Sequence, residues 1–142
     1  MNILVGLTSR PESRHAFDRA VEEASLRHAH LTIVRTMTEG LGENRGAISG
    51  WSDELTSTQE QGRELVKDLE QRGIEADFRL EQASSDPARL LLDIADEVGA
   101  DLIVIGIRRR SAVGKLVIGS ASQGVLLGAE CPVLAVKAPR ED

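Results

Sequence analysis

The residues whose types and spacing could do chemistry lie in one stretch, between positions 106 and 120. An apolar segment, Leu102–Ile105, leads into Gly106; the run Arg108–Arg110 follows, and Gly119 with Ser120 opens a helical pattern. The first backbone N–H groups of a helix have no partner within the helix, and the helix dipole is positive there. This order of strand, glycine, cations and helix start predicts an anion site, in which Gly119 allows close approach and Ser120 adds a hydroxyl donor.

The arginine run admits two interpretations. Charge runs usually lie on solvated faces, and three adjacent arginines cannot all point at one ligand. The flanking glycines and Ser120 favour an anion site to which Arg108 and Arg109 contribute charge. A P-loop is excluded, because Arg109 and Leu116 stand where that motif needs a glycine and a serine or threonine.

The remaining candidates for metal binding or catalysis have simpler interpretations. His28 and His30 have no third ligand nearby in the sequence, so a solvated helix C-terminus is favoured. Cys131 has no CxxC partner and is interpreted as a small buried hydrophobe. Spacing indicates neither a Ser/His/Asp set nor paired carboxylates at a strand end. The sequence therefore predicts no metal ion and no catalytic residue.

Composition excludes several classes of partner. The 142 residues fit one domain, 1–142, and 41% hydrophobic residues are enough to build its core. A net charge of -6 and 2% aromatic residues argue against binding to nucleic acid, whether through its phosphates or by base stacking. We find no signal peptide pattern and no segment long enough to span a membrane, and one cysteine suits a reducing compartment. The expected location is the cytoplasm.

Hydrophobic periodicity predicts alternating strands and helices. The strands are expected at Ile3–Leu7, Leu31–Thr36, 74–80, Leu102–Ile105 and Val133–Val136. The helices are expected at Glu12–Arg27 with Ser9 or Ser13 as cap, at Leu55–Leu69, at 87–98 between Asp86 as N-cap and Gly99, and at Ser120–Leu127. Four glycines between Met37 and Ser52 predict a long loop there.

This alternation predicts a doubly wound, Rossmann-like α/β domain with a five-stranded, mainly parallel sheet. In such sheets ligands lie at the carboxyl ends of strands, where the strand order reverses. The loops Thr8–Pro11 and Ile107–Ile118 follow the first and fourth strands. We expect them to flank one crevice.

The chain resembles a known family over nearly its whole length. The shared features are Ile3-Leu4-Val5, Glu12-Ser13, Asp86-Pro87, the segment from Gly99 to Gly106, Gly119-Ser120 and the segment from Cys131 to Val136. Their order and spacing are similar to those of the universal stress protein family. The resemblance implies a Rossmann-like fold, a cytoplasmic role in stress survival, and a homodimer that pairs through the C-terminal strand.

The resemblance also implies a nucleotide site. Gly106, Gly119 and Ser120 match family positions that hold phosphates, and the adenine is expected near Gly6, Leu7 and Thr36. Two positions depart from the family pattern. Thr8 stands where an aspartate contacts the ribose, so at most a hydroxyl remains, and Arg109 stands where a second glycine is expected. Arg109 would either block the phosphate or replace a backbone donor by a charged one.

Three functions are compatible with these residues. The first is an adenine-nucleotide-binding regulatory protein, taking ATP or AMP without fast turnover. The second is a nucleotide-free dimeric interaction module of the same family with a degenerate ATP site, which Thr8 and Arg109 would favour. A slow ATPase or phosphotransferase ranks last, because the motif places no general base, and the expectation is that the protein is not an enzyme.

Overall fold

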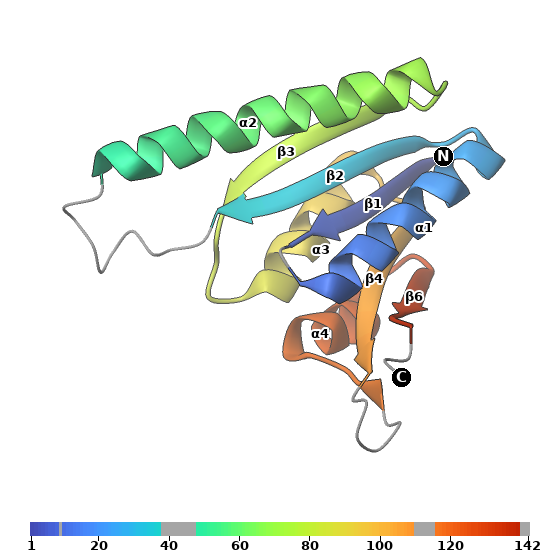
Figure 1. Cartoon of the computed structure of the whole chain (residues 1–142). Coiled ribbons are helices and arrows are strands. Elements are labelled where there is room, and N and C mark those ends of the chain that lie inside the picture. Colours follow the sequence, from blue (N-terminus) through green and yellow to red (C-terminus); the bar gives the residue numbers. More distant parts are fainter. Residues whose placement is uncertain (9, 38–47, 110–115, 140–142) are drawn as a thin grey trace.

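The computed structural model describes residues 1–8, 10–37, 48–109 and 116–139, with the side chains of 48–54, 109, 116 and 117 also left undescribed (Figure 1). Five strands form a parallel sheet in the order β3-β2-β1-β4-β6. They are β1 (Asn2–Leu7), β2 (His30–Met37), β3 (Ala76–Gln82), β4 (Leu102–Arg109) and β6 (Val133–Lys137). The predicted five-stranded, Rossmann-like α/β fold is confirmed. A two-residue strand, β5 (Leu116–Val117), pairs antiparallel with the end of β4.

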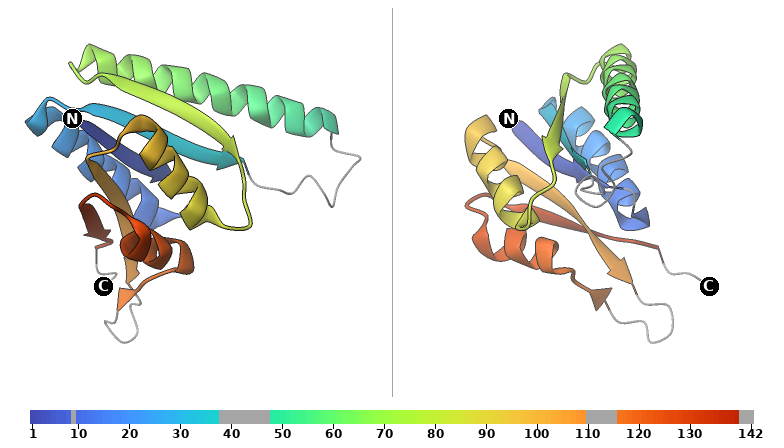
Figure 2. Two further views of the ribbon diagram at one scale, coloured as in Figure 1. Left: turned by 180° about the vertical axis from the view of Figure 1, so that it is seen from behind. Right: turned by 90° about the vertical axis from the view of Figure 1, so that its left-hand side faces the viewer.

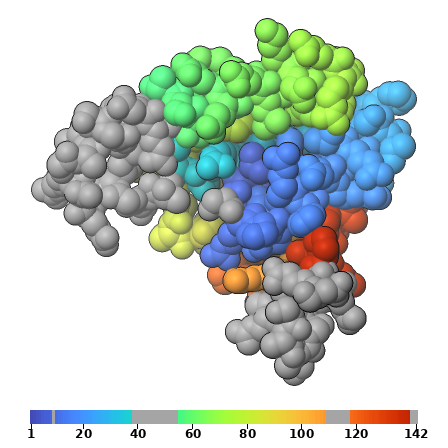
Figure 3. Space-filling view, viewed as in Figure 1, coloured from blue at the N-terminus to red at the C-terminus, as the bar shows by residue number. Residues whose placement is uncertain are grey.

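Four helices cover the two faces of this sheet: α1 (Pro11–Arg27), α2 (Ile48–Gln71), α3 (Pro87–Val98) and α4 (Ser120–Gly128). Helices α1 and α2 lie on one face, and α3 and α4 lie on the other (Figure 2). In the space-filling view, α1 and α2 cover most of the face turned to the viewer (Figure 3). None of the helices in the described part of the chain is both long enough and apolar enough to cross a membrane.

The hydrophobic core has two parts, one on each face of the sheet, because successive strand residues point to opposite faces. Ile3 and Val5 of β1 belong to the cluster under α1 and α2, whereas Leu4 belongs to the cluster under α3 and α4. All three are fully buried. Strands buried on both faces read as continuous apolar runs, which is why β1 and β4 are visible in the sequence.

The strand order reverses beside β1. The chain moves from β1 to β2 and then β3 on one side, and later to β4 and β6 on the other. Loops that leave β1 and β4 therefore diverge to opposite sides of the sheet. This divergence opens the crevice described below.

Helix α3 has the termini that its sequence predicts. The Asp86 side chain accepts a hydrogen bond from the Arg89 N–H at 3.1 Å, which caps the first turn. Gly99 ends the helix with φ at +64°, a left-handed conformation that glycine adopts at little cost. Because α3 follows the parallel strand β3, it starts at the carboxyl edge of the sheet.

The start of α1 corrects a prediction. Arg10 occupies the N-cap position without a side-chain hydrogen bond to the helix, so Ser13 is not the N-cap, and Ser9 lies outside the described residues. Ser13 is buried, and its Oγ accepts from the Thr8 N–H at 2.7 Å. The same hydroxyl donates to the Gly6 carbonyl oxygen at 3.4 Å. Ser13 therefore fixes the turn that leaves β1.

Two expected loop boundaries were also wrong. Strand β4 continues through Gly106 to Arg109, because β6 pairs with it as far as Ile107 and β5 pairs with its last two residues. Helix α2 begins at Ile48, inside the segment expected to be a loop. Ile48, Trp51 and Leu55 already stand at helical spacing, which the surrounding glycines obscure. Residues 38–47 lie outside the described part.

Candidate functional site

Two cavities open at the carboxyl edge of β1, β2 and β4. The first, which we call the apolar pocket, encloses about 150 Å³. It is lined by Gly6, Leu7, Thr8, Val34, Thr36, Pro87, Leu90, Leu91, Ile105, Ala121, Ser122 and Val125. No charged side chain is among these lining residues. An apolar pocket with a few hydroxyl groups suits a flat heterocycle or another uncharged group.

The second cavity, the polar cavity, is larger, at about 440 Å³. It is lined by Gly6, Thr8, Arg10, Glu12, Ser13, Thr36, Pro87, Leu91, Val104, Ile105, Gly106, Arg108, Gly119, Ser120, Ala121 and Ser122. It therefore adds cations and a helix start to the residues of the apolar pocket. The two cavities share Gly6, Thr8, Thr36, Pro87, Leu91, Ile105, Ala121 and Ser122, so they form one continuous cleft.

The polar cavity contains the N-terminus of α4. Gly119 is the N-cap and has no side chain, so the first turn of α4 receives no side-chain cap. The first intrahelical bond runs from the Gln123 N–H to the Gly119 carbonyl oxygen at 2.9 Å. The N–H groups ahead of Gln123 are therefore without an intrahelical acceptor and carry the positive end of the helix dipole. This end of the cleft is suited to an anion.

Charged side chains reinforce that preference. Arg10, at the start of α1, and Arg108, near the end of β4, line the polar cavity from two different elements. Both are exposed, so their charges stay solvated at this lining without a large cost of desolvation. Glu12 is the one carboxylate that the described residues place in this lining. The positive charge of two guanidinium groups and a helix N-terminus exceeds the negative charge of this carboxylate.

The two motif glycines in the polar cavity have different roles. A Cβ atom at Gly106 would overlap the Glu12 carbonyl oxygen, so this glycine is needed for the close approach of α1 to β4. A Cβ at Gly119 would meet nothing within 4 Å. Gly119 has φ at -65° and ψ at 160°, an extended conformation open to any residue. Gly119 thus leaves space for a ligand and imposes no packing constraint.

The turn after β1 is held by its own hydrogen bonds. The Thr8 N–H is bound by Ser13, and the Thr8 Oγ1 accepts from the Arg10 N–H at 3.2 Å. Among the described residues none accepts the Thr8 hydroxyl proton, which is therefore available to a ligand. Ser122, in the first turn of α4, donates from Oγ to the Gly106 carbonyl oxygen at 3.4 Å and so ties α4 to β4.

The structure brings nearly all the sequence-predicted site residues to this cleft. Gly6, Leu7, Thr8 and Thr36 line the apolar pocket, and Gly106, Arg108, Gly119 and Ser120 line the polar cavity. Arg109 is the exception: its backbone pairs with Leu116, and its side chain lies outside the described residues. Whether any of these residues binds a ligand stays a prediction.

Sequence reasoning missed several lining residues. Arg10, the N-cap of α1, lies in the expected loop Thr8–Pro11 but was not named; Glu12 stands on the first turn of α1, and Pro87 and Leu91 stand on the first turns of α3. Because α3 follows β3, its start also lies at the carboxyl edge of the sheet. The rule that ligands lie at the carboxyl ends of parallel strands located the loops after β1 and β4, and it could also have located the loop after β3. The role of Ser122 depends on how α4 approaches β4, which no local pattern reveals.

The residues considered for metal binding and redox chemistry lie elsewhere. His28 forms the left-handed C-cap of α1, with φ at 53°, and His30 Nε2 lies 2.8 Å from an Asp77 carboxylate oxygen. Cys131 is half-buried against the α3 and α4 side of the core, and burial raises the pKa of its thiol. Across the described ranges, no group of three or more His, Cys, Asp or Glu could hold a metal ion.

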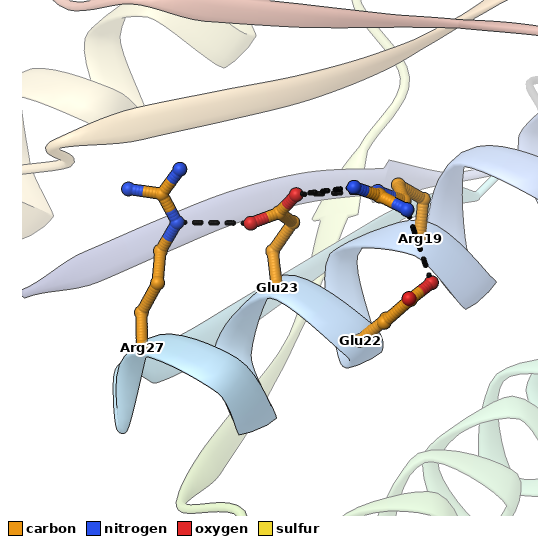
Figure 4. A network of polar contacts seen from close by, with 4 residues as sticks. All are labelled: Arg19, Glu22, Glu23 and Arg27. Atoms are coloured by element: carbon orange, nitrogen blue, oxygen red, sulfur yellow. Dashed lines mark hydrogen bonds and ion pairs between the residues drawn. The ribbon is translucent and has the colours of Figure 1, made fainter.

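A polar network on α1 was not anticipated (Figure 4). The Glu23 carboxylate is buried and accepts from Arg19 Nη2 at 2.8 Å and from Arg27 Nε at 2.9 Å. Hydrogen bonds from Arg27 and Arg19 lower the pKa of Glu23, against the opposing effect of burial. Arg19 also contacts the exposed Glu22 at 3.2 Å. None of these residues lines the cleft.

Several proteins of known structure share this fold over their whole length. A universal stress protein from Archaeoglobus fulgidus is 32% identical with a TM-score of 0.69, covering 96% of this chain and 98% of that chain. Two more distant structures contain nucleotides. One is an Archaeoglobus fulgidus universal stress protein in complex with dAMP, at 23% identity and a TM-score of 0.61, with 96% and 98% covered. The other is a universal stress protein in complex with cAMP, at 21% identity and a TM-score of 0.63, with 98% of each chain covered.

Sequence comparison identifies the family directly. A universal stress protein from Mycolicibacterium smegmatis is 34% identical over 136 residues, which cover 95% of this chain and 96% of the relative. A universal stress protein A homologue from Coxiella burnetii is 32% identical over 139 residues, covering 95% and 93%. The model of the universal stress protein family matches residues 1–137. The chain belongs to the universal stress protein family.

Proposed function

We propose that this protein binds an adenine nucleotide, ATP or AMP, and acts as a regulatory protein of the cytoplasmic stress response rather than as an enzyme. In this proposal the base occupies the apolar pocket, and the phosphates occupy the polar cavity at the N-terminus of α4. Arg10 and Arg108 supply charge to the phosphates. The sugar lies between these two ends.

The observation that carries the proposal is the continuity of the two cavities. An uncharged, mostly apolar pocket opens directly into a cavity with two arginines and an uncapped helix start. A nucleotide has the same two halves, a flat base and an anionic phosphate chain. The complexes of two related proteins with dAMP and cAMP add support, because they show that this fold can accommodate such ligands.

The residues present leave room for a nucleotide. Gly119 has open space beside its Cα, so a phosphate can approach the first N–H groups of α4. A Cβ at Gly6 would reach only ordinary contact with Leu91, at 4.0 Å, so side chains do not fill the space beside Gly6 where the two cavities overlap. Bound in this way, the nucleotide would be oriented by the helix dipole and by the two arginines.

The proposal is tested first by direct binding. The purified protein is denatured, its supernatant is analysed for nucleotides by anion-exchange chromatography, and the nucleotide-free protein is titrated with ATP and AMP by calorimetry. We expect saturable binding and a rise in melting temperature at millimolar nucleotide, because a ligand that binds only the folded state stabilises it. No bound nucleotide, no titration heat and no thermal shift would refute the proposal.

Gly119→Val locates the site. The valine side chain would occupy the approach to the α4 N-terminus, in a position where it meets no other residue of the described chain. Nucleotide affinity should fall at least about tenfold while the fold persists. Leu127→Ala is the control, because Leu127 is on the same helix but 80% exposed and outside both linings. Equal affinities in the two variants would show that the nucleotide binds elsewhere.

A second candidate function is favoured by Thr8. A threonine offers only a neutral hydroxyl where the two cavities overlap, and this would suit a nucleotide-free dimeric module that acts through its surface. Such a protein would be a homodimer but would ignore ATP and AMP. The titration above separates the two candidates, and the dimer is tested independently through β6 in the Discussion.

A further inference from the structure

The place where the two cavities overlap, which we call the waist, has polar groups that could contact a sugar. If the base lies in the apolar pocket and the phosphates lie at the α4 N-terminus, the sugar must lie against the residues that both linings share. This inference rests on the proposed function. The shared residues with polar side chains are Thr8, Thr36 and Ser122. All three carry neutral hydroxyl groups.

Two of these hydroxyls are already engaged within the protein. Ser122 Oγ donates its only proton to the Gly106 carbonyl oxygen at 3.4 Å. Thr8 Oγ1 accepts from the Arg10 N–H at 3.2 Å, which leaves its proton and one lone pair. A sugar hydroxyl can therefore find a neutral acceptor or donor at the waist, with Thr8 and Ser122 offering reduced capacity beside Thr36.

No carboxylate of the described residues reaches the waist. Glu12 lines the polar cavity but not the apolar pocket, so it belongs to the phosphate end of the cleft. The distinction matters because a carboxylate accepts charge-assisted hydrogen bonds, which are roughly twice as strong as neutral ones. The three hydroxyls, Thr36 included, can give a ribose 2′-hydroxyl only neutral hydrogen bonds in exchange for its bonds to water.

The geometry points to a site that barely distinguishes ribose from 2′-deoxyribose, and so accepts ribonucleotides and deoxyribonucleotides alike. Exchange of a water hydrogen bond for a neutral protein hydrogen bond changes affinity by about fivefold, whereas a bond to a carboxylate changes it by more than about tenfold. We therefore expect the affinities for AMP and 2′-deoxy-AMP to differ by less than about fivefold. The site then selects its ligands by their base and their phosphate groups, and the sugar adds little to the selection.

The test compares AMP with 2′-deoxy-AMP by calorimetry on the unmodified protein at one ionic strength. A ratio of affinities below about five supports the inference. A larger preference for AMP overturns it while leaving nucleotide binding intact. If neither ligand binds, the proposed function itself has failed, and the inference falls with it.

Thr8→Asp tests whether the sugar lies where the overlap places it. An aspartate at position 8 can still accept from the Arg10 N–H, as Thr8 does, so the turn should survive. It should raise the ratio of AMP to 2′-deoxy-AMP affinity above about tenfold, even if the added charge weakens both ligands. Thr8→Asn is the matched control, similar in shape but neutral, and should keep the ratio below about five. A Thr8→Asp protein that folds, binds both nucleotides and keeps the original ratio would contradict the placement of the sugar beside Thr8.

Discussion

At the scale of single residues, the two glycines of the motif serve the fold and the cleft separately. Gly106 lies inside β4, pressed against the first turn of α1, and Gly119 stands free at the start of α4. Both line the polar cavity. A side chain at Gly106 would push α1 away from the sheet, whereas one at Gly119 would only enter the cleft. Stability and binding should therefore respond to different glycines.

Gly106→Ala should destabilise the protein by about 1–3 kcal/mol, the usual cost of forcing extra atoms into a packed interior. The backbone oxygen of Glu12 is the obstacle, and backbone cannot move aside as a flexible side chain can. Gly119→Ala is the matched control and should cost less than about 1 kcal/mol, the loss of a favourable N-cap residue. Urea unfolding followed by circular dichroism gives both values. Equal losses in the two variants would show that α1 does not need Gly106.

The sequence predicted much of this site because local patterns carry its chemistry. Gly119 and Ser120 are visible as a helix start, and Gly6 and Thr8 are visible as the end of a buried strand. The purpose of Gly106 was not predictable in this way. It depends on the distance between β4 and α1, two elements far apart in the chain. The contacts of Ser13 Oγ with Thr8 and Gly6 likewise depend on how α1 packs against the end of β1.

At the scale of elements, α1 contains a polar stripe formed by Arg19, Glu23 and Arg27. The three residues stand four apart, so they share one side of the helix. The carboxylate is only 10% exposed, while the two arginines are 43% and 48% exposed. A buried carboxylate is tolerated because charged donors satisfy it from both sides.

Glu23→Gln should destabilise the protein by about 1.5–3 kcal/mol at pH 7, the usual contribution of hydrogen bonds to a charged group. The pKa of Glu23 is lowered from its usual value of 4.5 by folding, so its stabilising contribution is complete above that value. As the pH falls below 4.5, toward the pKa of the folded state, the contribution is lost and the two proteins converge.

Urea unfolding of both proteins at several pH values between 7 and 3.5 measures this convergence. Glu22→Gln is the control, because Glu22 is exposed and shares Arg19 as its partner. An exposed pair contributes less than about 1 kcal/mol. A difference between wild type and Glu23→Gln that stays constant with pH would refute the assignment of charge to Glu23.

The elements themselves were predictable in kind but less so in extent. Continuous apolar runs fixed the positions of β1 and β4, and Asp86 with Gly99 marked both ends of α3. The extension of β4 to Arg109 depends on pairing with β5 and β6, which lie later in the chain. Helix α2 already begins at Ile48, although the glycines around this position would favour a loop.

At the scale of the whole molecule, the sheet ends in β6 on one side. Within the described chain, β6 pairs with β4 along one of its edges only. The Ala138 N–H bonds the Ile107 carbonyl oxygen, and the Pro132 carbonyl oxygen accepts from Ile103. Since strand residues alternate in direction, Ala135 turns its backbone N–H and C=O away from β4. An exposed edge of this kind is a template for another strand.

We expect two copies to pair through this edge into a homodimer, with β6 of each chain as the contact. Ala135→Pro should produce a monomer, because proline removes an outward N–H without removing a bond to β4. Ala135→Val is the matched control, since valine keeps that N–H and favours strands. Sedimentation equilibrium reports the mass, which should be about twice 15.4 kDa for wild type and Ala135→Val, and near 15.4 kDa for Ala135→Pro.

A wild-type protein that stays at the single-chain mass at every concentration would rule out the dimer. A dimer that Ala135→Pro leaves intact would place the interface on another surface. The cleft opens at the carboxyl edge of β1, β2 and β4, and its lining residues include none from β6, so the monomeric variant should still bind nucleotide.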